Sequence, residues 1–242
     1  MSRKGYSLQA FALSRIYYAQ FGKKYGTVFT MEMNNKQYLI TAKHLSELMS
    51  FSPQNEAVLP VFYKRKIQNI PVKLVGHCPN EIDISVLTAD SEFKAPITMT
   101  PDSPNYAYGE DVYFFGFPYP AERNPRLVIN DNNFTPFVKK GAIAYASQSY
   151  FFIDGHSNPG FSGGPVVMQF LDDSENPEND LYHVIGVVRG YQTTNIPVFN
   201  KLGETMFKFN ENSGITLVYD IQAAVNVINA NPIGVPINHK PK

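Results

Sequence analysis

The chain has 242 residues, of which 43% are hydrophobic, and its 21 basic residues balance its 21 acidic residues. This size allows one large all-β domain or two small ones with a sizeable core. A formal net charge of zero argues against a nucleic-acid-binding or membrane-surface protein, because both usually carry a basic patch. Cys78 is the only cysteine, so no internal disulfide can form, and a reducing, cytoplasmic location is expected.

The N-terminal segment indicates neither secretion nor insertion into a membrane. Arg3 and Lys4 follow Met1, but polar side chains interrupt residues 7–16, so no long apolar run develops. We therefore expect no signal peptide and no transmembrane helix. The pattern predicts no particular structure for the leader at residues 1–12.

Short strands rich in Tyr, Phe, Ile, Val and Thr fill most of the first 90 residues. Asn34-Asn35 predicts a hairpin turn, and a helical turn is expected at 46–49. The expected strands cover residues 14–21, 26–33, 36–41, 57–66, 71–76 and 84–87. Residues 94–108 contain several prolines and turn-forming side chains, and are therefore the best linker candidate.

A second set of strands follows, at 111–115, 141–147, 150–153, 165–170, 183–189 and 215–219. A polar loop at 119–133 and an acidic loop at 172–180 separate some of them. Residues 220–229 have apolar side chains at helical spacing, and Asp220 is a plausible N-cap.

These elements predict an all-β fold of two packed six-stranded antiparallel β-barrels, chymotrypsin-like in arrangement, with a short C-terminal helix. A single sandwich is the alternative. The expected boundaries are 1–95 for the leader and first barrel, 96–108 for the linker, 109–219 for the second barrel, and 220–242 for the helix and tail.

The most informative stretch is residues 158–165, with the sequence NPGFSGGP. Glycine adopts positive φ and tolerates close backbone approach, so glycines around Ser162 predict a tight turn that presents its hydroxyl. Such a turn can also direct N–H groups at one point, as attack on a carbonyl requires. The alternative interpretation is an ordinary Gly/Pro turn. It becomes less plausible only if catalytic partners for Ser162 are found elsewhere in the chain.

Two residues upstream supply such partners. His44 ends the apolar stretch YLITA, and Asp83 lies between two isoleucines, where a carboxylate must be hydrogen-bonded to be buried. Taken singly, His44 fits a packed or capping histidine and Asp83 a turn residue. Together with Ser162 they follow the His-Asp-Ser order of chymotrypsin-type triads, which differs from the orders of other serine hydrolases.

Four motifs resemble those of the trypsin-like serine peptidases and are closest to the HtrA-like branch. They are LITAKH at 39–44, DISVL at 83–87, GEDVYFFGFP at 109–118 and NPGFSGGP at 158–165. The resemblance implies Ser162 as nucleophile, His44 as general base and acid, and Asp83 as the residue that orients His44. It implies an oxyanion hole formed by the backbone N–H groups of Gly160 and Ser162, and no metal or cofactor.

The resemblance has two departures. Phe161 occupies the position at which trypsin has an aspartate that pairs with a newly cut N-terminus, so activation by zymogen cleavage is not expected. Only a short tail follows the predicted helix, so we expect no PDZ domain of the HtrA kind. We expect an enzyme that is competent as synthesised and restrained by loop order, a partner or a rare substrate.

The resemblance also assigns substrate-binding residues. His156 would lie at the base of the specificity pocket, and the adjacent Ser157 is a further substrate-binding candidate. Arg189, Gly190 and Tyr191 would lie near the substrate backbone. Without an aspartate at the base, a preference for Lys or Arg is disfavoured. His156 either accepts a polar substrate side chain or is a hydrogen-bonded structural residue, and the sequence leaves both open. The pair His77-Cys78 is interpreted as structural because it lies in no glycine-rich turn.

The sequence therefore predicts a serine endopeptidase that cleaves a specific protein or peptide substrate through an acyl-enzyme. The alternative is a catalytically idle protease-fold module that binds peptides or acts as a sensor. A third option is a peptidase that matures one partner protein. A regulatory protein partner is a further expectation, whereas nucleic-acid and membrane partners are not expected.

Overall fold

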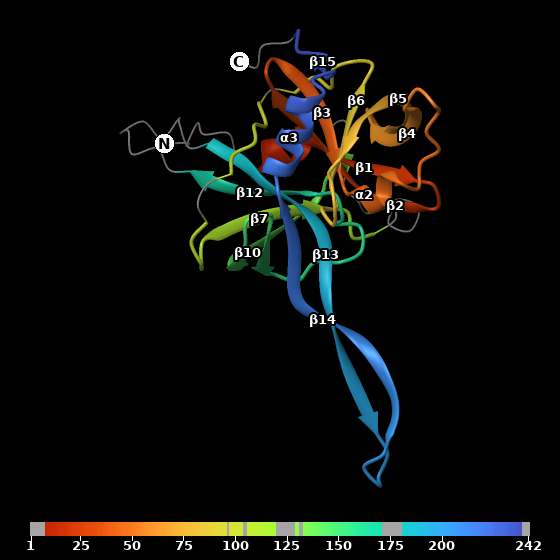
Figure 1. Ribbon diagram of the computed structural model, residues 1–242, viewed down its shortest axis with the longest axis vertical. Coiled ribbons are helices and arrows are strands. Elements are labelled where there is room, and N and C mark those ends of the chain that lie inside the picture. The colour runs from red at the N-terminus through yellow and green to blue at the C-terminus, as the bar shows by residue number, and fades with distance from the viewer. Residues whose placement is uncertain are drawn as a thin grey trace.

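The computed structural model describes residues 8–95, 97–103, 106–119, 129–130, 133–170 and 181–238. Two β-barrels pack against each other, and one long strand pair projects beyond them (Figure 1). The prediction of a double barrel with a short C-terminal helix is confirmed, and the single-sandwich alternative is wrong.

The first barrel contains all the strands up to Ala89. Its strand order is β3-β2-β1-β4-β5-β6, and the pairing of β3 with β6 closes it. The elements are α1 (Leu8–Arg15), β1 (Ile16–Phe21), β2 (Lys24–Met33), β3 (Lys36–Thr41), α2 (Lys43–Ser46), β4 (Glu56–Tyr63), β5 (Lys66–His77) and β6 (Ser85–Ala89). Strand β1 thus begins two residues later than the strand predicted at 14–21, because Ser14 and Arg15 end α1.

Arg15 is fully buried and joins the first barrel to the segment that leads to the second. Its guanidinium donates to the carbonyl of Ile97 at 2.7 Å and pairs with Glu32 at 2.5 Å. A buried charge needs such partners, because its desolvation is costly. The linker predicted from the prolines is therefore held against the barrel at Ile97.

The second barrel closes in the order β10-β11-β14-β13-β12-β7. Its strands are β7 (Asp111–Gly116), β10 (Phe137–Ala146), β11 (Tyr150–Asp154), β12 (Pro165–Phe170), β13 (Leu181–Phe199) and β14 (Thr205–Asp220), with a small separate pair, β8 (Ile129–Asn130) and β9 (Asn133–Phe134). The predicted loop at 172–180 lies outside the described residues, as does most of the loop at 119–133. The strands predicted at 183–189 and 215–219 are much too short, since β13 and β14 continue as a paired ribbon.

The C-terminal segment crosses back to the first barrel. Ile221 is the N-cap position of helix α3 (Gln222–Ala230), one residue after the predicted Asp220, but the Asp220 carboxylate still accepts a hydrogen bond from the N–H of Gln222 at 2.7 Å. Strand β15 (Val235–Pro236) then pairs with β3 in the first sheet. Among the described residues, no helix is long and apolar enough to cross a membrane.

Candidate active site

His44 and Asp83 come together because their strands are neighbours. His44 lies in α2 directly after β3, Asp83 precedes β6, and β3 pairs with β6 at Thr41–Ser85. The His44 Nδ1 lies 2.5 Å from one carboxylate oxygen of Asp83, and the His44 backbone N–H donates to the other at 2.7 Å. Because an ionised carboxylate only accepts, Nδ1 carries the proton in this arrangement, and Nε2 is left able to take one.

The segment before the serine forms a tight turn, as its glycines predict. The N–H of Phe161 donates to the carbonyl of Asn158 at 3.1 Å, with Pro159 and Gly160 at the central positions. Gly160 has φ +95, which identifies a type II turn. A Cβ at Gly160 would lie 1.9 Å from the carbonyl oxygen of Phe117, so no larger residue fits here.

The turn type determines the direction in which the N–H of Gly160 points. Type I and type II turns differ in the orientation of the peptide between their two central residues, here Pro159 and Gly160. Among the described residues, none accepts a hydrogen bond from the backbone N–H of Gly160 or of Ser162. Both donors are thus available to an external oxygen atom, which is the chemical requirement for an oxyanion hole.

The first barrel holds this turn of the second barrel in place through Thr27 on β2. The Thr27 hydroxyl donates to the carbonyl of Gly160 at 2.8 Å, and its N–H donates to the carbonyl of Ser162 at 3.0 Å. The Thr27 carbonyl in turn accepts from the hydroxyl of Thr41, three residues before His44, at 2.8 Å. One short chain of hydrogen bonds therefore joins the serine turn to the strand that ends at His44.

The Ser162 hydroxyl is directed at a backbone carbonyl. Its Oγ donates to the carbonyl oxygen of Arg189 at 2.9 Å, and within the described part of the chain it forms no hydrogen bond with His44. Catalytic hydrogen bonds are often unformed in a substrate-free site and tighten only when substrate binds. Transfer of the serine proton to His44 therefore requires a rotation of the Ser162 side chain.

A trypsin-like peptidase domain model matches residues 26–169, more than half of the chain. The chain belongs to the trypsin-like peptidase family. No curated protein sequence matches it significantly.

Solved structures with the same fold include several proteases, among them one of the HtrA type. A serine endoprotease from Yersinia pestis has a TM-score of 0.54 at 18% identity, over 95% of this chain and 66% of that one. The HtrA-type protease AlgW has a TM-score of 0.51 at 20% identity, over 90% and 60%. The MamO protease domain of Magnetospirillum magneticum has a TM-score of 0.50 at 15% identity, over 89% and 96%. At these identities the likeness establishes the fold alone.

The residues expected at the pocket base are held by a residue of the long strand pair. Asn212 on β14 donates through Nδ2 to the carbonyl of Ser157 at 2.7 Å and lies 3.2 Å from Nε2 of His156. Since the amide nitrogen donates, His156 Nε2 is the acceptor in this contact. Of the two roles left open for His156, a hydrogen-bonded structural residue agrees with this geometry. The Ser157 hydroxyl is buried without a hydrogen-bond partner among the described residues.

Arg189, Gly190 and Tyr191 lie on β13, where it leaves the barrel. The Arg189 Nε is 3.9 Å from Oδ2 of Asp83, and its side chain is half exposed. At this distance and exposure the ion pair is weak. A Cβ at Gly190 would lie 3.9 Å from the Ser162 Oγ, so this part of β13 borders the serine directly.

Lys139 on β10 is a site residue that sequence reasoning missed. Its ammonium donates to Oδ1 of Asn158 at 2.7 Å and to the carbonyl of His156. It also lies 5.1 Å from the ring centroid of Phe161, within the range of a cation–π contact. Desolvation at this position lowers the pKa of Lys139 from its usual value. No local motif marks Lys139, because its role depends on the pairing of β10 with β7.

His77 and Cys78 take no part in this arrangement. Cys78 is buried, and its burial raises the pKa of the thiol to about 12, which leaves it unreactive at neutral pH. His77 Nδ1 lies 2.6 Å from the hydroxyl of Ser85. This geometry agrees with the structural interpretation of the pair. Among the described residues, no group of three or more His, Cys, Asp or Glu is placed to hold a metal ion.

Proposed function

We propose that this trypsin-like peptidase is an active serine endopeptidase that cleaves a protein substrate through an acyl-enzyme. The observation that carries the proposal is the doubly hydrogen-bonded His44–Asp83 pair, together with a type II turn whose two N–H groups have no acceptor among the described residues. Ser162 is the nucleophile in this proposal. The single buried cysteine favours a reducing compartment, so we expect a cytoplasmic substrate.

In the first step, the Ser162 hydroxyl turns from Arg189 toward His44 and attacks the scissile carbonyl. The proton passes to Nε2 of His44, while Asp83 holds the ring and stabilises the imidazolium. The N–H groups of Gly160 and Ser162 receive the negative charge that develops on the carbonyl oxygen. Loss of one such donor typically lowers the rate by about 10²–10³.

In the second step, His44 donates the proton to the departing amine and the acyl group remains on Ser162. Water then attacks the ester, with His44 again acting as base, and the free carboxylic acid leaves. No metal or cofactor takes part in this sequence.

Ser157, expected beside the pocket base, is fully buried, and its hydroxyl has no partner among the described residues. Such a group costs about 1–3 kcal/mol when left unsatisfied. If residues 156–158 shift on binding and bring this hydroxyl within reach, we expect a polar side chain on the residue before the scissile bond. No acidic side chain stands at residues 156–158, so a preference for Lys or Arg is not expected.

A fluorophosphonate probe tests the proposal directly, since it labels only a serine that is activated as a nucleophile. We expect labelling of the wild type, none of Ser162→Ala, and much slower labelling of His44→Ala. Comparison of new protein N-termini in cells with wild type and with Ser162→Ala then identifies the substrate.

The rival function is a peptide-binding module that does not cleave. It is favoured by one observation, the Ser162 hydroxyl directed at Arg189 and not at His44. A folded wild-type protein that shows no Ser162-dependent labelling, with or without added peptides, would favour the binding module. That result would overturn the proposal of an active enzyme.

A further inference from the structure

Arg189 is the extra residue of a β-bulge beside the candidate nucleophile. The residues on either side of it pair with two adjacent residues of β14, in the pairs Val188–Val218 and Gly190–Leu217. Arg189 itself is left without a partner in this ladder, which is the arrangement that defines a bulge. Bulges re-aim side chains and are frequent next to active sites. The position therefore indicates a functional role for the Arg189 side chain.

The bulge also marks the start of an open edge on β13. Pairing of β13 with β12 ends at Val187–Pro165, and beyond it β13 pairs only with β14 and continues into the ribbon of residues 192–212 (Figure 1). An extended peptide can add to such an edge through backbone hydrogen bonds. Because the Ser162 hydroxyl lies 2.9 Å from the Arg189 carbonyl, a peptide on this edge presents its scissile bond next to Arg189.

The guanidinium of Arg189 is directed at Asp83 but is largely unused. Its Nε lies 3.9 Å from Oδ2 of Asp83, and the side chain is 51% exposed. The two oxygens of Asp83 already accept shorter hydrogen bonds from His44, at 2.7 Å and 2.5 Å. Among the described residues, the Arg189 side chain forms no hydrogen bond. Its planar fork of donors is thus available to a second carboxylate.

The alternation of side chains along an extended peptide decides which substrate residue meets Arg189. Neighbouring side chains of a strand point to opposite sides. The residue before the scissile bond is expected to point at residues 156–158, which belong to the second barrel. The residue before that one then points the other way, toward His44 and Asp83 of the first barrel, where the guanidinium lies.

Given the proposed peptidase function, on which this inference rests, we propose that Arg189 selects substrates with an acidic side chain, Asp or Glu, two residues before the scissile bond. The guanidinium binds that carboxylate through two parallel N–H···O hydrogen bonds, a geometry that a lysine ammonium does not offer. Arg189 is in this assignment a specificity residue that contacts the substrate.

Two acidic residues near Arg189 make the selection depend on the guanidinium itself. Burial raises the pKa of Tyr219 on β14, Asp83 and Glu81 raise it further, and Arg189 opposes them. Both acids therefore share this neighbourhood with Arg189. Glu81 is exposed, and among the described residues it forms no ion pair with Arg189. Without the guanidinium, the two acids would repel a substrate carboxylate.

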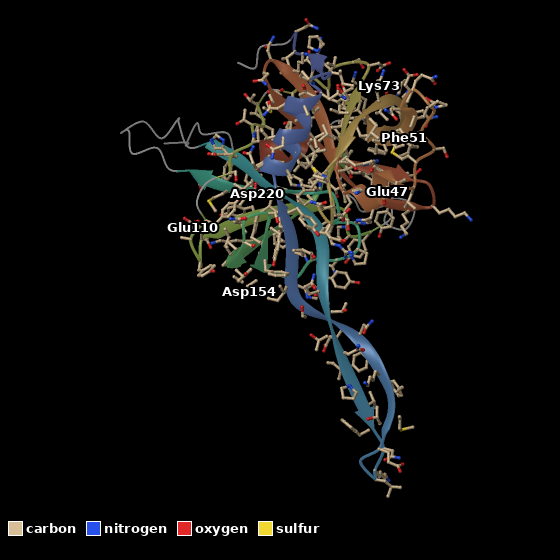
Figure 2. All side chains as sticks on the ribbon, in the orientation of Figure 1. Glu47, Phe51, Lys73, Glu110, Asp154 and Asp220 are labelled. Atoms are coloured by element: carbon tan, nitrogen blue, oxygen red, sulfur yellow. The ribbon has the colours of Figure 1, made fainter. Side chains whose placement is uncertain are left out.

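The other charged groups on the surrounding elements are placed differently. Lys43, next to His44, donates from its ammonium to the carbonyl of Cys78 at 3.5 Å. Glu47 follows α2 on the first barrel, and Asp154 on β11 is separated from β13 by β14 (Figure 2). Lys43 is therefore a matched control for Arg189, being a second cation beside the His44–Asp83 pair.

Fluorogenic peptide libraries that differ only two residues before the scissile bond test the proposal, with Glu compared with Gln and Asp with Asn. For the wild type we expect kcat/KM to favour the acid about fivefold to tenfold at low salt. Added salt should reduce this ratio, because the contact is half exposed. In Arg189→Met the ratio should fall to one or below, whereas Lys43→Met should keep the wild-type ratio.

Charge reversal supplies the opposite test. Arg189→Glu should favour Lys over Gln at the same substrate position, whatever its overall rate. Equal cleavage of acidic and neutral peptides by the wild type would overturn the proposal. So would an equal loss on both peptides in Arg189→Met, because Arg189 would then act only by orienting Asp83.

Peptide binding separates this proposal from the peptidase function, because it requires no cleavage. An array of the same peptide pairs is probed with folded Ser162→Ala and with S162A/R189M. If fluorophosphonate fails to label the wild type, the peptidase function is wrong, but stronger binding of the acidic peptides that depends on Arg189 would still support the selection. Equal binding of acidic and neutral peptides by Ser162→Ala would overturn it.

Discussion

The ring of Phe161 packs edge-on against the ring of Phe114, with 5.7 Å between the centroids. Phe161 is fully buried in the second barrel and directly precedes the nucleophile. In this chain the buried ring of Phe161 thus anchors the turn that carries the serine. Trypsin has an aspartate at this position, which forms an ion pair with the newly cut N-terminus. Burial of a ring depends on no newly formed N-terminus, which explains how the turn can be ordered without cleavage.

Removal of this anchor should loosen the turn as well as the core. Phe161→Ala is expected to lower the free energy of unfolding by about 3–5 kcal/mol, as is usual for buried Phe→Ala changes, and to slow fluorophosphonate labelling of the protein that remains folded. Phe93→Ala is the matched control, since Phe93 is buried in the first barrel against Tyr17 and Tyr63. Equal labelling rates for the two folded variants would contradict a role for Phe161 in ordering the turn.

Gly160→Ala should abolish most activity for a steric reason. The new Cβ would collide with the Phe117 carbonyl, so the turn must change shape and its N–H must move. We expect kcat/KM to fall by about 10²-fold or more. Gly109→Ala separates this effect from backbone strain alone, because Gly109 has a similar φ of +86 and open space around it. A comparable loss of activity in both variants would refute the steric explanation.

Lys139→Met should reduce activity more than stability. The change keeps an unbranched side chain but removes the ammonium that holds Asn158 and the His156 carbonyl. We expect kcat/KM to fall by about tenfold, with a loss of stability near 1 kcal/mol. Lys140→Met is the control, as Lys140 only pairs with Asp111 at an exposed position. Unchanged kinetics in Lys139→Met would show that its contacts do not shape the pocket.

His77 should make the fold less stable in mild acid. Burial lowers the pKa of His77 below its usual value of 6.5, an effect partly opposed by Glu47 and reinforced by Lys43. The unfolded chain therefore binds the proton more readily, so the free energy of unfolding falls as the pH drops through about 6.5. Urea unfolding near pH 7.5 and pH 5.5 should show a larger loss for wild type than for His77→Gln. Identical losses would mean that His77 does not cause the acid sensitivity.

The candidate triad could be predicted from the sequence because each of its residues lies in a short, recognisable sequence motif. Ser162 lies among glycines, His44 ends an apolar strand and Asp83 begins another, and their order along the chain is informative in itself. The double barrel followed from short alternating strands on both sides of a proline-rich linker.

Thr27, Lys139 and Asn212 could not be predicted in the same way. Each acts on the site through a hydrogen bond to a residue more than fifteen positions away, and a lone Thr, Lys or Asn carries no local signal. The ribbon was also missed, because its asparagines, threonines and Pro197 resemble a loop until the register pairs Ile196 with Phe209.

The sequence alone determined which residues could carry the chemistry and that the chain forms two barrels, since these depend on side-chain type, order and short-range alternation. Only the tertiary structure decided how the pieces face one another. It determined the type II form of the turn at Gly160, the direction of the Ser162 hydroxyl and the projection of the ribbon. These depend on contacts between distant strands, which register and packing establish and which no local pattern contains.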